Sequence, residues 1–232
     1  MKQLYELYEN TLGASGFYNH LSRRIKDNPS LYNNQLLLYP PTYNYNKSNV
    51  DITVKKGDSR FDMPLAIGNS SAKERILILG LEPRHTDDFF NIMRVGTKVF
   101  ASPFGIDRWY ATSGKKNYYG TAFADFLSPN RIFLFSDFVK EYKVYDPNDK
   151  EQNSENARND FKNLFEHSYK SILENEISVF KPTLIVGLGK GDILKKVDKS
   201  FLEEHSINVI SHPVNGNMNR MKLAMHKLLK NQ

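Results

Sequence analysis

The sequence predicts an α/β fold, a three-layer α/β/α arrangement around a central, mostly parallel four-stranded sheet. Four short apolar runs are separated by longer segments, and each run is followed by glycine, proline or polar residues. Runs that are apolar throughout are typical of strands buried on both faces, as in parallel sheets covered by helices. The four runs occupy residues 76–79, 132–135, 184–186 and 207–210.

Residues 1–72 are predicted to form an N-terminal extension of helix and loop, and residues 73–232 the α/β core of one domain. Apolar residues at helical spacing predict helix over 2–27, either continuous or broken into a pair around Gly13 and Gly16. Residues 29–70 are rich in Asn, Tyr and Pro without a sustained period. We expect them to wrap the surface, with stacking on nucleic-acid bases as the alternative role of the tyrosines.

A further helix is predicted over residues 155–175, between the second and third apolar runs. Its apolar residues recur with a period of about 3.6; they are Ala157, Phe161, Leu164, Phe165, Tyr169, Ile172 and Leu173. This alternation of strand and helix is what favours a parallel sheet.

The composition excludes several classes of chemistry. The chain of 232 residues has no cysteine, so disulfides, thiolate zinc sites, iron–sulfur clusters and cysteine nucleophiles are absent. The six histidines show no metal-ligand spacing, and we expect neither a metal nor a cofactor. No apolar run approaches the roughly 20 residues of a membrane span, and the N-terminus lacks the apolar stretch of a secretory signal. We therefore expect a cytoplasmic protein without a membrane partner.

The charge distribution is compatible with a polyanionic partner. The formal net charge is +6, and residues 181–230 alone hold nine Lys or Arg against four Asp or Glu. Most of the basic surplus therefore lies in the C-terminal quarter, where it would favour contact with phosphates.

Polar residues follow each predicted strand, at the edge where ligands bind in open parallel sheets. The segments are 80–87, 136–140, 187–192 and 211–219. Glu82 precedes Pro83 and His212 precedes Pro213, so both stand just beyond a strand; an exposed loop Glu and a structural His are the alternatives. The glycine-rich segment 187–192 fits neither the dinucleotide nor the P-loop spacing, and a tight turn explains it.

Over residues 75 to 230 the chain resembles the uracil-DNA glycosylase superfamily. The first motif of that superfamily matches Gly80, Leu81, Glu82 and Pro83, with His85 nearby. Its last motif, a strand ending in His-Pro before a DNA-penetrating loop, matches residues 211–218, and residues 184–189 resemble its Leu-Gly strand segment. Each motif is short, and the match depends on their order, spacing and strand context.

The resemblance implies a role for each site residue. Glu82 would activate water and oppose the positive charge that develops on the sugar, while His212 would donate to the pyrimidine O2. The base flips out of the helix before cleavage. Residues implied to contact the base are Asp137, Phe100, Phe104, Arg84 and His85, and those implied to contact DNA are Asn215, Asn217, Met218, Arg220 and Lys190. Met218 would be an apolar wedge; core packing is the alternative for Met218, Phe100 and Phe104.

Two departures from the family pattern alter the expected base. Asp137 stands where uracil enzymes have Asn, and an ionised carboxylate only accepts hydrogen bonds, so it suits the N4 amine of cytosine rather than uracil O4. Arg84 stands where those enzymes have a Tyr that blocks pyrimidine C5 substituents. The sequence thus predicts excision of cytosine or a 5-modified cytosine, such as the hydroxymethylated or glucosylated base of phage DNA, which would suit phage defence.

Three functions remain open at this point. The first is a monofunctional glycosylase for modified cytosine, acting as a monomer on double- or single-stranded DNA at the nucleoid. The second is a uracil or mismatch glycosylase of DNA repair. The third is a non-catalytic nucleic-acid or nucleotide binder on the same fold. No lysine adjoins the motif in a way that requires Schiff-base chemistry, and Lys140 is the one to examine.

Overall fold

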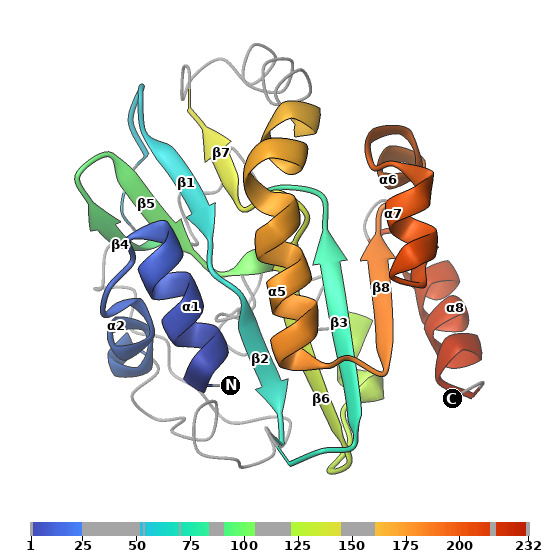
Figure 1. The fold of residues 1–232 in the computed structure, drawn as a ribbon. Helices are drawn as coiled ribbons and strands as arrows, with labels where there is room; N and C mark the ends of the chain where they lie inside the picture. Colours follow the sequence, from blue (N-terminus) through green and yellow to red (C-terminus); the bar gives the residue numbers. More distant parts are fainter. Residues whose placement is uncertain are drawn as a thin grey trace.

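The computed structural model describes residues 2–24, 52, 54–69, 71–83, 91–104, 122–144, 161–213 and 217–230. Figure 1 shows the described elements as one α/β assembly, with strands at its centre and helices against them. The chain is therefore of the α/β class, as the sequence predicts. None of the described helices combines the length and apolar composition that a bilayer span requires.

The main sheet has five strands in the order β2-β6-β3-β8-β9. β6, β3, β8 and β9 run parallel, whereas β2 pairs antiparallel with β6 at the edge. The four parallel strands contain the four predicted apolar runs, and β2 is the strand that the prediction lacks. The bounds are β2 Leu65–Gly68, β3 Glu74–Gly80, β6 Arg131–Asp137, β8 Leu184–Leu188 and β9 Ile207–Ile210.

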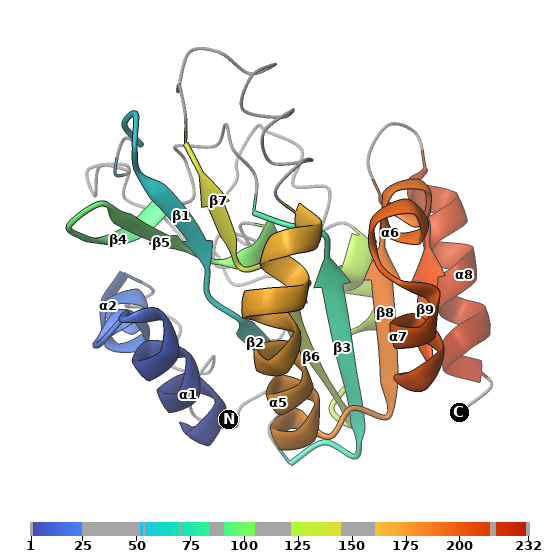
Figure 2. The same cartoon turned by 45° about the horizontal axis from the view of Figure 1, so that its top comes forward.

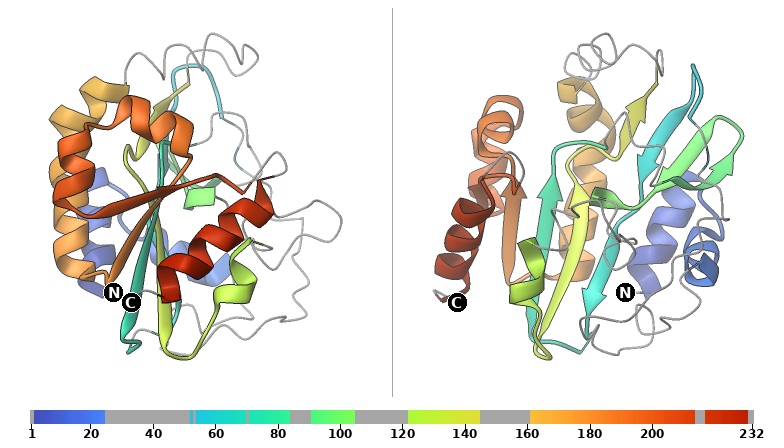
Figure 3. Two further views of the ribbon diagram at one scale, coloured as in Figure 1. Left: turned by 90° about the vertical axis from the view of Figure 1, so that its right-hand side faces the viewer. Right: turned by 180° about the vertical axis from the view of Figure 1, so that it is seen from behind.

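Helices lie on both faces of this sheet. Figure 3 shows α5 and α7 on one face and α8 with the short η4 on the other. The bounds are α5 Lys170–Phe180, α6 Lys190–Lys196, α7 Lys199–Glu204, α8 Met218–Lys230 and η4 Ala124–Phe126. Of the helix predicted over 155–175, residues 155–160 lie outside the described residues. The described part is helical from residue 161, passes through a π-helical turn, η5 (Phe165–Tyr169), and extends to the end of α5.

A second, four-stranded sheet adjoins the first, in the order β4-β5-β1-β7. Figure 2 shows these strands beside the N-terminal helices. The strands have three to five residues, too few for a period to be visible, so none was predicted from the sequence. The bounds are β1 Ser59–Asp62, β4 Asn91–Val95, β5 Lys98–Ala101 and β7 Glu141–Lys143.

The N-terminal segment consists of the broken helix pair, α1 (Lys2–Leu12) and α2 (Phe17–Arg24). Gly13 and Gly16, with φ of 70° and 80°, adopt the left-handed conformation that favours glycine and separates the helices. The segment contributes buried side chains to the main core. The strands β1 and β2 lie within residues 29–70, the range that was expected to wrap the surface. Residues 1–72 are thus more than a loop-rich surface extension, because β2 is part of the main sheet.

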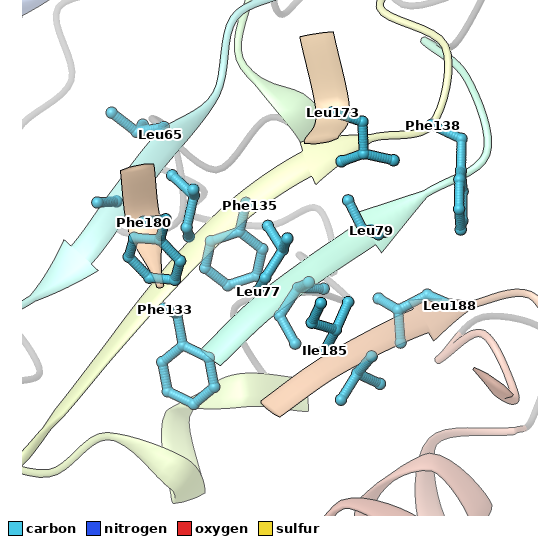
Figure 4. Packing of buried hydrophobic residues seen from close by; sticks show 14 of the residues in the cluster. Leu65, Leu77, Leu79, Phe133, Phe135, Phe138, Leu173, Phe180, Ile185 and Leu188 are labelled. Atoms are coloured by element: carbon cyan, nitrogen blue, oxygen red, sulfur yellow. The ribbon is translucent and has the colours of Figure 1, made fainter. Parts of the chain in front are cut away.

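The hydrophobic core lies on the two faces of the main sheet. Ile76 to Leu79 of β3 and Phe133 to Phe135 of β6 have no exposed surface. Figure 4 shows Leu77 and Leu79 of β3 and Ile185 of β8 among the buried side chains, with Leu173 and Phe180 of α5 nearby. Burial of both faces explains why these strands are apolar throughout.

Candidate active site

Three predicted site residues stand at the same edge of the main sheet. β3, β6 and β9 are parallel, so their carboxyl ends lie at one edge. Asp137 is the last residue of β6, and Glu82 and His212 each follow two residues after the end of β3 and β9. β6 adjoins β3, whereas β8 separates β3 from β9 by about 10 Å, two strand spacings. The edge therefore holds Asp137 beside the Glu82 strand, with His212 further along.

Asp137 is paired in register with Gly80, two residues before Glu82. A Cβ built on Gly80 would overlap Oδ1 of Asp137 and would lie 2.8 Å from Cζ of Phe104. Both side chains therefore lie directly over the Gly80 backbone. This position requires glycine because of the close approach of its neighbours.

Gly80→Ala should destabilise the protein by about 1–3 kcal/mol, because the added methyl would displace the Asp137 carboxyl or the Phe104 ring. Urea unfolding measures the loss. The matched control is Gly191→Ala in α6, where a Cβ meets nothing within 4 Å. Equal stability of the two variants would contradict the close packing over Gly80.

Phe104 and Phe100, the two predicted stacking residues, have different environments. Phe100 has no exposed surface and lies in the core, its ring centroid 5.5 Å from that of Phe61. Phe104 is partly exposed and makes an edge contact with Phe135 at 6.1 Å. Its φ of 58° is a left-handed conformation that is costly for an aromatic residue and that clusters at functional sites. Phe104, rather than Phe100, is the stacking candidate at the Asp137 position.

The Asp137 carboxyl is 2% exposed, and its Oδ2 has no hydrogen-bond partner among the described residues. Burial, and next the nearby charge of Asp62, raise the pKa of Asp137 well above its usual range, although Lys140 and Arg60 oppose the shift. The protonated form of Asp137 is thus favoured far more than for an exposed Asp. A protonated carboxyl can donate one hydrogen bond as well as accept, unlike the ionised carboxylate expected from the sequence.

A proton retained on Asp137 predicts an unusual pH dependence of stability. Because its pKa is raised on folding, the folded state binds more protons than the unfolded state above about pH 4, and stability falls as pH rises. In Asp137→Asn this loss should be absent, so the variant should gain stability over the wild type between pH 5 and pH 8. Urea unfolding across that range tests this, with Asp192→Asn on exposed α6 as control. Parallel curves for wild type and Asp137→Asn would refute the raised pKa.

A fully buried ionic network lies behind Asp137, on the opposite face of β6. Lys140 and Glu176 have no exposed surface, and Lys140 Nζ lies 3.1 Å from Glu176 Oε2. The Ser136 hydroxyl donates to Glu176 at 3.0 Å, and Tyr8 of α1 donates to the same carboxylate. Lys140 also donates to the Asp137 carbonyl. The network therefore holds the end of β6 in place. Lys140, the lysine named in the sequence analysis as a candidate for Schiff-base chemistry, has a structural role.

Glu82 has a partner that no local pattern in the sequence indicates. The Nζ of Lys196, in α6, lies 3.2 Å from Glu82 Oε1. The Lys196 side chain is only 18% exposed and the Glu82 side chain 20%. Nζ also lies 4.8 Å from the ring centroid of Phe161, at cation–π distance. The two residues are 114 positions apart in the chain. Glu82 is therefore not an isolated loop carboxylate but half of a partly buried ion pair.

The residues predicted to contact DNA have mixed placements. Lys190 and Arg220 are exposed, and Asn217 and His212 are partly exposed. Met218 begins α8 and packs against the hydrophobic core, which matches the alternative to the wedge role. Arg84, His85 and Asn215 lie outside the described residues. In the described ranges no group of three or more His, Asp or Glu is arranged to hold a metal ion.

Comparison with known proteins adds no relative, since no protein-family model and no curated protein matches the chain. Fold and site together define an α/β protein with two carboxylates and a histidine at the carboxyl edge of a parallel sheet.

Proposed function

We propose that this protein is a DNA glycosylase that hydrolyses the N-glycosidic bond of a flipped-out pyrimidine and leaves an abasic site. The observation that carries the proposal is the pairing of Gly80 with Asp137, which brings a base-reading carboxyl next to the strand that leads to Glu82. The partly exposed ring of Phe104 over the same glycine supports it, since a flipped base needs an aromatic face. The parallel strands β6, β3, β8 and β9 agree with the three-layer glycosylase-like fold that the resemblance implies.

In this proposal the charges match those of the reaction. Cleavage develops positive charge on the sugar and negative charge on the departing base. Glu82 would lie under the sugar, orient the attacking water and oppose the positive charge. His212 would donate to O2 of the base, and exposed Lys190 and Arg220 would contact phosphates.

Asp137 supports a cytosine-type base in either protonation state. An ionised Asp137 accepts from the N4 amine of cytosine, and a protonated Asp137 accepts from N4 while donating to N3. Uracil, with O4 as an acceptor and N3–H as a donor, forms both hydrogen bonds only with the protonated form, because an ionised carboxyl accepts from N3–H but has no donor for O4. The N4 amine of cytosine donates to the carboxyl in both states, so a cytosine, including the 5-modified cytosines of phage DNA, is the base that we favour.

Uracil or mismatched pyrimidine is the second candidate, favoured by one specific observation. Burial raises the pKa of Asp137, and the protonated carboxyl would then offer a donor and an acceptor, as the Asn of uracil enzymes does. A repair function would follow from such selectivity.

The test is incubation of the protein with duplex and single-stranded DNA carrying one defined base, followed by scoring of abasic sites. The bases are cytosine, uracil, 5-hydroxymethylcytosine and glucosylated 5-hydroxymethylcytosine. Excision confined to a cytosine supports the first candidate, and excision confined to uracil supports the second. DNA binding without abasic sites on any substrate would overturn the proposal in favour of a non-catalytic binder.

Asp137→Asn should shift the selectivity toward uracil, because the amide always donates to O4 and accepts from N3–H. Replacing a mismatched buried polar edge by a matched one is worth about 1–3 kcal/mol, or roughly fivefold to 150-fold in the uracil-to-cytosine ratio. The gain should grow as pH rises, since wild-type Asp137 loses its donor when it ionises. An unchanged ratio at every pH would remove Asp137 from the base pocket.

A further inference from the structure

Lys196 of α6 forms an ion pair with Glu82 at the proposed reaction centre. Its Nζ lies 3.2 Å from Glu82 Oε1, and its side chain is 18% exposed, so it is neither a freely solvated lysine nor a fully buried one. The Phe161 ring, 4.8 Å from Nζ, borders it on another side. The ammonium group is thus held at a defined position beside the carboxylate.

The contrast with Lys140 shows why this position matters. The Lys140 Nζ has no exposed surface and contacts Glu176, the Ser136 hydroxyl and the Asp137 carbonyl. An ammonium group has three donor hydrogens, and these contacts occupy them. Among the described residues Lys196 donates a hydrogen bond to a single carboxylate, that of Glu82, and its side chain retains some exposed surface.

Resting on the glycosylase function proposed above, we infer that Lys196 is the nucleophile of a second activity, cleavage of the DNA strand at the abasic site through a Schiff base. Such a Lys needs a neighbouring base to take its proton, and Glu82 stands at hydrogen-bond distance for this transfer. The protein would then be bifunctional instead of the monofunctional enzyme that the sequence predicts. The ligand class is a DNA strand that carries an aldehydic abasic sugar.

The steps balance without any co-reactant except water. The Lys196 ammonium gives a proton to the Glu82 carboxylate, and the free amine adds to the C1′ aldehyde of the opened sugar. The adduct loses its hydroxyl group as water, using the proton on Glu82, and leaves a protonated imine. Glu82 then takes a C2′ proton, a C2′–C3′ double bond forms, and the C3′–O bond breaks to release a 5′-phosphate end. Hydrolysis of the imine restores Lys196 as the ammonium, and the C2′ proton on Glu82 passes to the released phosphate, so the starting ion pair forms again.

The experiment uses the full chain and a duplex with one preformed aldehydic abasic site, so that base excision is not required. Sodium cyanoborohydride reduces an imine to a stable amine, and a covalent protein–DNA complex then appears on a denaturing gel. Peptide mass spectrometry of the wild-type complex identifies the attached lysine directly. The variants are Lys196→Gln and Lys196→Arg, with Lys195→Gln on the exposed face of the same helix as the matched control.

We expect the adduct on Lys196, its loss in both Lys196 variants and its retention in Lys195→Gln, together with strand cleavage that follows the same pattern. In the wild-type protein, no adduct, or an adduct on another lysine or on the N-terminal amine, would overturn the inference. This readout does not depend on whether the variants fold. Base excision from the substrate panel without an adduct would leave the glycosylase proposal intact and reject the lyase. An adduct on Lys196 without excision from any substrate would support the lyase and reject the glycosylase proposal.

Discussion

Glu82→Gln should reduce the rate of base excision by about 10²- to 10³-fold while the protein still binds DNA. The change keeps the size of the side chain and removes the negative charge that would oppose the developing sugar cation, and a preorganised electrostatic group of this kind has an effect of that order. Single-turnover kinetics on the duplex that the wild type cleaves best measures the chemical step. Fluorescence anisotropy on the same duplex measures binding.

Two controls isolate the effect of Glu82. Glu204→Gln replaces an exposed carboxylate of α7 and should leave the rate unchanged. Lys196→Gln removes the same ion pair from its other end while leaving the Glu82 charge in place. A wild-type excision rate in Glu82→Gln would exclude Glu82 from the reaction.

Lys140→Met should destabilise the protein by about 3–5 kcal/mol, the usual cost of leaving a buried carboxylate without its counter-charge. Glu176 is fully buried, and its remaining donors, Tyr8 and Ser136, are neutral. Burial raises the pKa of Tyr8 well above its usual range, and the Glu176 charge raises it further, so Tyr8 stays a neutral donor. The free energy of unfolding in urea is the measurement.

The double variant Lys140→Met with Glu176→Leu separates charge from packing. Replacing both partners by apolar residues removes the unpaired charge and should recover most of the lost stability. Lys195→Met changes an exposed lysine and should have little effect. A Lys140→Met protein as stable as the wild type would show that the Lys140–Glu176 pair does not stabilise the fold.

The buried network also explains why the N-terminal helices belong to the same folding unit as the site. Tyr8 of α1 reaches Glu176 of α5 across 168 positions of the chain, and Glu176 accepts from Ser136, the residue before Asp137. The contact connects α1 to the end of β6. Substitutions in α1 that remove this contact should therefore affect the end of the strand that carries Asp137.

The sequence by itself determined the four buried strands of the parallel sheet and the placement of Glu82, Asp137 and His212 at strand ends. It also determined an N-terminal helical segment, either continuous or broken around Gly13 and Gly16. Strands buried on both faces are apolar throughout, and glycine between helical segments interrupts them, so local patterns are sufficient to predict these features. Parallel strands then bring their carboxyl ends to one edge, whatever the rest of the chain does.

Only the tertiary structure decided the neighbours of those residues. It distinguished Phe104 over Gly80 from Phe100 in the core, and it revealed the pairs Lys196–Glu82 and Lys140–Glu176. The short strands of the second sheet and β2 were equally absent from the sequence pattern. The physical reason is that a pKa, an ion pair or an aromatic contact depends on side chains that are distant in sequence, whereas hydrophobic periodicity is a local property of the chain.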